Sequence, residues 1–210
     1  MTLDEIIAAL RIESATPALT AGMAHAAKLA PIIYAIADKF CDSVYLLPRD
    51  NVLLFNGLHV LAAAKHPDLC DHLMDIAEQD IDLLNQLFPD HITTSLARLL
   101  LSVWDREAAE LFDRIERPYM APDVNWAFYD VLARLTFDGR ISRNETAAFL
   151  ERIERDNLID DGDMNWWGWE QAVMKLGLVE LEPALRRVWT KPIYEQHSEA
   201  DHAATLDRLR

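Results

Sequence analysis

Leu96-Ala97-Arg98-Leu99 and Leu132-Ala133-Arg134-Leu135 are the same four residues 36 positions apart, and the chain around them repeats one pattern. Each copy belongs to a long, mostly apolar segment that is followed by a short polar break and a shorter amphipathic segment. Two further copies lie around residues 58–61 and 172–175, and the first of these precedes residues 96–99 by 38 positions. Periods of about 35 to 45 residues with two helices per unit are typical of HEAT-like and armadillo-like solenoids.

The composition agrees with a helical protein. Only six glycines occur in 210 residues, and the nine prolines fall mainly between the helical segments. A hydrophobic content of 51% excludes a disordered chain. We therefore predict an all-α fold, a HEAT/armadillo-like α-solenoid of stacked helical pairs in a single domain over residues 1–210. Irregular N-terminal helices would occupy residues 1–47, about four helical pairs residues 48–190, and a C-terminal capping helix residues 191–210.

Several helix ends are marked by local signals. A first helix is expected over residues 3–13, and Pro17 and Pro31 are each expected to begin a helix, because proline is well tolerated in the first turn. Residues 142–145, Ser-Arg-Asn-Glu, have the form of a capping box. Residues 198–201, Ser-Glu-Ala-Asp, form a weaker version that opens the last helix.

The charge of the chain is strongly negative and unevenly distributed. The formal net charge is −15, and residues 67–123 alone hold thirteen acidic and four basic side chains. Nucleic-acid binding requires Lys and Arg to neutralise phosphates. The acidic balance therefore argues against a nucleic-acid partner.

Nothing in the sequence predicts a membrane segment or a secretory signal. The longest uncharged apolar stretch, residues 51–64, is shorter than the ~20 residues that a membrane-spanning helix needs. The first five residues include two acids, Asp4 and Glu5, and lack the basic and then apolar order of a signal peptide. Cys41 and Cys70 are too few for a disulfide framework. We expect a cytoplasmic protein with reduced cysteines and no membrane partner.

An acidic stripe is the first candidate site. Residues 68–90 contain seven acids and no Lys or Arg. If the segment is one helix, four of these acids fall on one face at i, i+4, i+7 and i+11. They are Asp71, Asp75, Glu78 and Asp82. Asp80 would then project onto the apolar face, so we expect a break near Gln79 with Asp80 capping a second short helix. The stripe is either a solvated face or a docking surface for a basic partner.

Aromatic residues form the second candidate site. Tryptophans and tyrosines concentrate in two neighbouring repeats, where stacked helices would bring them together. Packing between repeats explains most of them, but a groove for a peptide or small molecule is the alternative. The residues expected to line it are Trp126, Tyr129 and Trp167. Buried Trp and Tyr side chains need hydrogen-bond partners, and Asp130 and Glu170 are candidates.

No metal or cofactor site is predicted. His66, Cys70 and His72 lie close together in the sequence, but zinc needs three or four ligands and a helix presents only the i, i+4 pair on one side. The acidic loop at residues 156–165 fails the EF-hand register and is better explained as a turn. Motifs of nucleophilic hydrolases, zinc proteases and nucleotide-binding proteins are absent from the sequence.

The chain resembles a family of bacterial domains of unknown function numbered 1186, over nearly its full length. The resemblance rests on packing, capping and turn residues: Pro17-Ala18-Leu19, Leu29-Ala30-Pro31, Leu58–Ala62, Leu96–Leu100, Leu132–Leu135 and Gly139–Glu145. It implies a HEAT-like helical fold and no particular activity. Some members carry a C-terminal cysteine-rich metal motif that this sequence lacks, so zinc binding is not implied here.

These observations favour a non-enzymatic protein-interaction scaffold or inhibitor that uses the acidic surface to bind a protein with a basic surface. The alternative is a small-molecule binder or an enzyme with an aromatic-lined cleft between repeats. A third interpretation is a purely structural homodimer, since the sequence does not determine the oligomeric state. No spacing of carboxylates singles out a catalytic pair.

Overall fold

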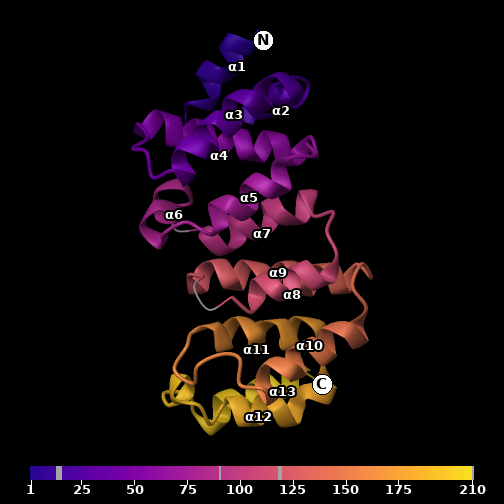
Figure 1. Cartoon of the computed structure of the whole chain (residues 1–210). Coiled ribbons are helices and arrows are strands. Elements are labelled where there is room, and N and C mark those ends of the chain that lie inside the picture. The colour runs from indigo at the N-terminus through magenta and orange to yellow at the C-terminus, as the bar shows by residue number, and fades with distance from the viewer. Residues whose placement is uncertain (13–15, 90, 118–119, 210) are drawn as a thin grey trace. The chain divides into compact units, whose positions relative to one another are not determined.

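The computed structural model describes residues 1–12, 16–89, 91–117 and 120–209. Within these ranges the chain forms thirteen α-helices, two short 3₁₀ turns and no β-strand (Figure 1). The predicted all-α class is therefore confirmed. The chain divides into two compact units, Met1–Asp105 and Arg106–Arg210, which are described separately. The boundary falls inside the region predicted to hold the helical pairs, and the prediction of a single domain stays a prediction.

Unit 1 contains seven helices that bury their apolar faces against one another. They are α1 (Leu3–Leu10), α2 (Thr16–Met23), α3 (Ala26–Cys41), α4 (Pro48–Ala63), α5 (Leu69–Ala77), α6 (Ile81–Leu87) and α7 (Ile92–Val103). Helix α4 contacts α1, α2, α3, α5, α6 and α7 and is the centre of the unit. Its buried residues include Leu53, Leu54 and Leu58, each 0% exposed.

The N-terminal helices differ in part from the prediction. Helix α1 ends at Leu10, and residue 13, its predicted end, lies outside the described residues. The prediction that Pro31 begins a helix is wrong, because Pro31 lies inside α3. The missing N–H of Pro31 leaves the carbonyl of Ala27 without its helical partner. Both residues are exposed, so water can replace that hydrogen bond.

The long apolar N-terminal region does not form a straight span. No single described helix is long and apolar enough to cross a bilayer. Helices α2 and α3 pass that test jointly, by length and composition only, but they are bent by 115° at the break between them.

Two residues of α4 fix the helices around it. A Cβ atom at Gly57 would lie 2.6 Å from Cγ1 of Ile33, so only glycine permits α3 and α4 to approach this closely. The side chain of the neighbouring Asn56 donates hydrogen bonds to the carbonyls of Leu10 (2.9 Å) and Ile12 (3.3 Å). Asn56 thus satisfies carbonyls at the end of α1, which a helix terminus otherwise leaves unpaired.

The predicted break in the acidic segment is confirmed. Helix α5 ends at Ala77, and α6 begins at Ile81. Asp80 is the N-cap of α6, and its carboxylate accepts a hydrogen bond of 2.8 Å from the backbone N–H of Asp82. Because the chain turns between the two helices, Asp80 is exposed and does not enter the apolar face of α5.

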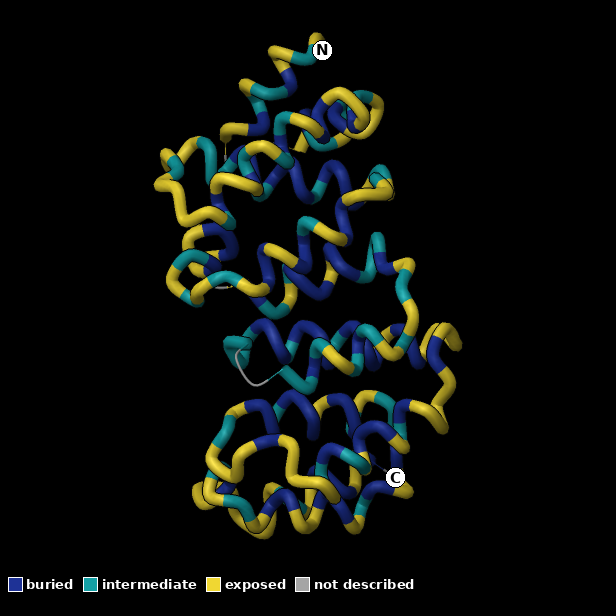
Figure 2. The backbone as a smooth tube through the Cα atoms, viewed as in Figure 1, coloured by how far each residue is buried: buried dark blue, intermediate teal, exposed yellow. Residues whose placement is uncertain are grey.

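Unit 2 contains six helices and the two 3₁₀ turns. The helices are α8 (Ala108–Ile115), α9 (Pro122–Phe137), α10 (Arg143–Arg155), α11 (Asn165–Leu176), α12 (Glu182–Val188) and α13 (Glu199–Leu209). The 3₁₀ turns are Val179–Leu181 and Pro192–Tyr194. The buried residues lie along the helices, whereas the loops between them are largely exposed (Figure 2). Arg210, the predicted end of the capping helix, lies outside the described residues.

Helices α9 and α11 run side by side in the same direction (Figure 1). Near their starts, the indole N–H of Trp126 donates to the carbonyl of Met164 at 3.1 Å. Further along both helices, Lys175 forms an ion pair with Asp130. Gly168 permits this close packing, because a Cβ there would lie 2.6 Å from Cδ1 of Trp126.

Both serine caps predicted in unit 2 are confirmed, and the second has both hydrogen bonds of a capping box. The hydroxyl of Ser142 accepts a 3.2 Å hydrogen bond from the N–H of Glu145 at the start of α10. At α13, the hydroxyl of Ser198 accepts from the N–H of Asp201 at 3.2 Å. The carboxylate of Asp201 accepts in return from the N–H of Ser198 at 2.9 Å.

Candidate functional site

The four acidic residues of the predicted stripe are all exposed, but they do not share one helix. Asp71 and Asp75 lie one turn apart on α5, Glu78 is the C-cap of that helix, and Asp82 lies in the first turn of α6. The i, i+11 spacing therefore does not place Asp82 on the face of Asp71.

Acidic residues of α3 add to the charge near Asp75. Burial, followed by the negative charges of Asp75, Asp38 and Asp42, raises the pKa of Cys41 to about 11. These carboxylates therefore lie close enough to Cys41 to act on it electrostatically. The acidic surface extends from α5 to the end of α3.

The three aromatic residues of the predicted groove lie together but do not all face solvent. The rings of Trp126 and Trp167 are 5.9 Å apart between centroids and are half-buried. Tyr129 is only 1% exposed, and its ring packs against Gly168. Burial, followed by the charges of Asp163 and Glu116, raises the pKa of the Tyr129 phenol, which stays protonated. This arrangement favours the packing interpretation, and a groove at these residues stays a prediction.

Of the two predicted partners, Glu170 serves buried aromatic groups, whereas Asp130 forms an ion pair instead. Asp130 is paired with Lys175, and Glu170 accepts hydrogen bonds from Trp189 and Tyr194. Neither the hydroxyl of Tyr129 nor the indole N–H of Trp167, both buried, has a hydrogen-bond partner in the described part of the chain.

The histidines considered as metal ligands pack around one tyrosine. The hydroxyl of Tyr34 is 2.8 Å from Nδ1 of His66, and its ring stacks on His72 with centroids 3.8 Å apart. Burial and the charge of Asp68 raise the pKa of Tyr34 to about 12. Among the described residues, no group of three or more His, Cys, Asp or Glu side chains is arranged to hold a metal ion.

A cavity in unit 1 is a well-formed candidate site. It has a volume of about 530 Å³ and lies between the start of α4, the end of α6 and the start of α7. We call it the α4–α6 pocket. Its walls are mainly apolar and include Tyr45, Leu46, Val52, Phe55, Leu87 and Phe88. Ligand pockets in proteins commonly measure 300–1,000 Å³ and are lined in this way.

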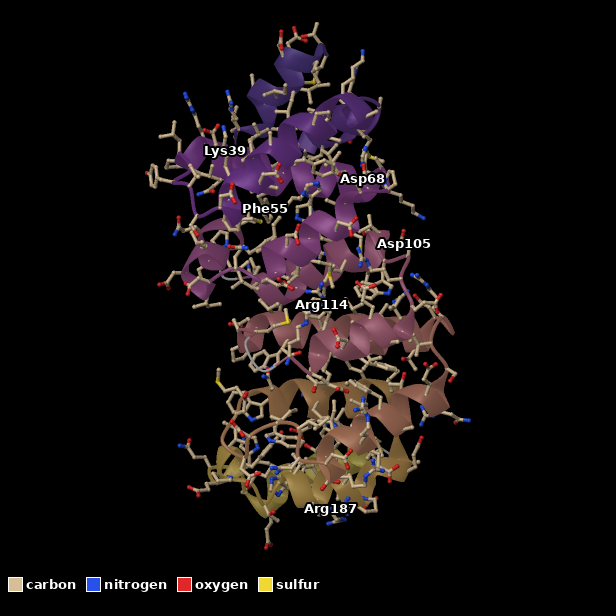
Figure 3. All side chains as sticks on the ribbon, viewed as in Figure 1. Lys39, Phe55, Asp68, Asp105, Arg114 and Arg187 are labelled. Atoms are coloured by element: carbon tan, nitrogen blue, oxygen red, sulfur yellow. The ribbon has the colours of Figure 1, made fainter. Side chains whose placement is uncertain are left out.

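The sequence places these side chains by simple geometry. Val52 and Phe55 lie on one side of α4, and the leucines at positions 53, 54 and 58 face the core of the unit. Phe55, labelled in Figure 3, contacts Phe88 edge to face, with ring centroids 6.1 Å apart. The preceding loop adds Tyr45, which is 79% exposed and forms an outer wall.

The polar groups of the pocket are mainly amides and a hydroxyl. They are Asn51, Asn56, Gln86, His91 and Ser95, and none of the described lining residues is Asp, Glu, Lys or Arg. The side-chain oxygen of Asn51 is buried and has no hydrogen-bond partner in the described part of the chain. A buried acceptor without a partner costs about 1–3 kcal/mol. A hydrogen-bond donor on a bound molecule would remove that cost.

A neutral histidine adjoins the apolar wall. The ring of His59 meets Phe55 edge to face, with centroids 4.7 Å apart. Burial lowers the pKa of His59, and the positive charge of Arg98 lowers it further. His59 therefore stays uncharged near neutral pH and adds no charge beside the pocket.

Sequence reasoning did not find this pocket. Its walls come from three segments that are brought together only by tertiary packing. One local signal was present, because Val44, Tyr45 and Leu47 are apolar residues in a loop and are each at least 45% exposed. Large apolar side chains exposed together in a loop commonly mark a binding surface.

Comparison of the chain with models of known protein families, with curated protein sequences and with solved structures finds no match.

Proposed function

We propose that this protein binds a small, neutral, mainly apolar molecule in the α4–α6 pocket. The observation that carries the proposal is the wall of the cavity. Its described residues include no Asp, Glu, Lys or Arg, although 26% of the residues in the chain are charged, and the buried acceptor on Asn51 has no partner among them. The ligand would place an aromatic or aliphatic body against the Phe55 and Phe88 side of the wall. It would donate one hydroxyl or N–H group to Asn51.

The neutral probe N-phenyl-1-naphthylamine tests this proposal, because it is apolar, carries a single N–H donor and fluoresces in an apolar environment. Titration into the whole protein should give saturable fluorescence. Val52→Phe should weaken binding at least about tenfold, because the added ring fills the cavity. Asn51→Leu removes the acceptor and should weaken binding by roughly three- to tenfold, which corresponds to one neutral hydrogen bond.

Val44→Phe is the matched control. It adds the same ring in the loop before α4, eight positions from Val52, but position 44 is half exposed and is not among the residues that line the cavity. This variant should bind the probe like the wild type. Equal affinities of the wild type and Val52→Phe would refute the proposed pocket.

A docking surface for a basic protein is the second candidate function. It is favoured by the exposure of Asp71, Asp75 and Glu78 and by the further carboxylates Asp38 and Asp42 near Cys41. Such binding would weaken with salt, because exposed charges are screened over about 8 Å at physiological ionic strength.

An oligolysine peptide is a direct probe of that surface. The triple reversal Asp71→Lys, Asp75→Lys, Glu78→Lys should abolish peptide binding measured by calorimetry. A matched reversal of the exposed acids Glu199 and Asp207 on α13 should leave most of it. Unchanged binding after the triple reversal would exclude the acidic surface as the docking site.

The wider interpretation also remains a proposal. The parallel pair α9 and α11, joined through α10, supports a HEAT-like arrangement of helical pairs. In unit 1, the starts of α4 and α7 border the same pocket, which supports a second parallel pair. Membership of the bacterial family numbered 1186, a cytoplasmic location and a non-enzymatic role are proposed on the sequence features given above.

A further inference from the structure

A second cavity lies in unit 2, apart from the proposed ligand pocket. Its volume is about 350 Å³, and it is formed by α11, by the loop before α13 and by α13. We call it the C-terminal pocket. Its charged or titratable lining residues are Glu170, His197, Asp201, His202 and Arg208. The elements that form it lie together at the C-terminal end of the chain (Figure 1).

Glu170 is the buried charge of this pocket. It is only 9% exposed. One carboxylate oxygen accepts a hydrogen bond from the indole N–H of Trp189 at 3.1 Å, and the other accepts from the hydroxyl of Tyr194 at 2.7 Å. Both donors are themselves buried, so they hold the carboxylate in one orientation.

Neither donor carries a positive charge. No Lys or Arg in the described part of the chain forms an ion pair with Glu170. Burial of an ionised carboxylate is costly unless a positive charge compensates it. Two neutral hydrogen bonds offset only part of that cost, and each carboxylate oxygen keeps a free lone pair. The site therefore favours a cation supplied from outside the chain.

The neighbouring groups define what kind of cation fits. The ring of His202 stacks on Trp189 with centroids 4.3 Å apart, and its buried Nε2 has no hydrogen-bond partner in the described residues. Hydrogen bonds from Ser198 lower the pKa of Asp201, which adds a second negative charge at the pocket. The positive charge of Arg208 lies at the exposed rim, and its guanidinium bonds to Ala204 and Thr205 of its own helix.

A metal ion does not suit this geometry. Zinc requires three or four converging ligands, and no such group occurs among the described residues. The cavity is also far larger than the ~30 Å³ occupied by one water molecule. An organic ion with an apolar body fits both the volume and the side chain of Met174, which lines the wall.

We propose that the C-terminal pocket binds a small organic ammonium ion, with the carboxylate of Glu170 as its counter-ion. The ammonium group donates to the free lone pairs of Glu170 and to Nε2 of His202, and the alkyl part lies along Met174. The proposal is independent of the ligand pocket in unit 1, and the two can fail separately.

The test uses n-butylammonium chloride as the probe and the indole N–H signal of Trp189 as the readout. This proton is bonded to Glu170, so its resonance in a ¹H–¹⁵N spectrum should move in a saturable manner. The Trp189→Phe variant assigns the signal. The uncharged isostere n-butanol should move it at least about tenfold less at equal concentration, because charged hydrogen bonds are worth roughly 1.5–3 kcal/mol.

Two variants complete the experiment. Glu170→Gln keeps the shape and removes the charge, and it should weaken n-butylammonium binding at least about tenfold, whereas Glu151→Gln on the exposed side of α10 should not. Met174→Lys places an ammonium group inside the pocket and should block the probe, whereas Met174→Leu should not. If n-butanol moves the signal as much as n-butylammonium does, or if Met174→Lys binds the probe like the wild type, the proposal is wrong.

Discussion

Gly168→Ala should destabilise unit 2 by about 2 kcal/mol. The added Cβ would lie 2.6 Å from Cδ1 of Trp126 and 2.7 Å from Cδ2 of Tyr129, whereas ordinary contacts measure 3.4–4 Å. Neither ring can easily give way, because Trp126 is hydrogen-bonded to Met164 and Tyr129 is 1% exposed. Overpacking of this kind costs about 1–3 kcal/mol, and sometimes more. Two ring contacts this short place the cost at the upper end of that range. Alanine regains up to about 1 kcal/mol through its helix propensity, so a net loss of about 2 kcal/mol is expected.

Urea denaturation followed by circular dichroism measures the effect. Gly168→Ala should lower the urea midpoint without changing the slope of the transition. Gly162→Ala is the control, because a Cβ there meets nothing within 4 Å. It should change the free energy of unfolding by less than about 0.5 kcal/mol. Equal or higher stability of Gly168→Ala would refute the inference that α9 and α11 are packed this closely.

Three further predictions concern unit 1. Asn56→Ala should lower the free energy of unfolding by about 2 kcal/mol and speed amide hydrogen exchange in α1, because two carbonyls lose their donor. Asn85→Ala, at an exposed site, is the control and should change neither quantity. Cys41 should be alkylated by iodoacetamide at pH 8 about a hundredfold more slowly than in the urea-unfolded chain, since its pKa is raised from 9.0 to about 11; equal rates would contradict this. Tyr34 should ionise near pH 12 in an ultraviolet titration. Because its pKa is raised on folding, its contribution to stability is present below pH 10 and is lost as the pH rises towards 12, and a Tyr34→Phe variant should lack this loss.

Features that depend on neighbouring residues could be predicted from the sequence. Ser142 and Asp80 cap their helices as expected, because a cap involves a side chain and an N–H only two or three positions away. Pro31 shows where such local rules fail, because it lies inside α3 and does not begin a helix. Proline is favoured at a helix start, but it is also tolerated on an exposed face where water replaces the lost hydrogen bond.

Features that depend on long-range packing could not be predicted in the same way. Glu170 was expected to serve a buried aromatic group, and it does, but its partners are Trp189 and Tyr194, 19 and 24 positions away. The α4–α6 pocket combines segments from residue 45 to residue 95. The periodicity of apolar residues shows which face of each helix is buried, but not where three packed helices leave a cavity between them.

The contact of Gly57 with Ile33 also has an evolutionary consequence. A chain that acquires a side chain at position 57 must lose volume at position 33, because the two helices leave no room for both. Substitutions at these positions are therefore expected to be correlated among descendants of a common ancestor. Covariation of positions 33 and 57 would therefore help to identify homologues whose overall sequence identity is low.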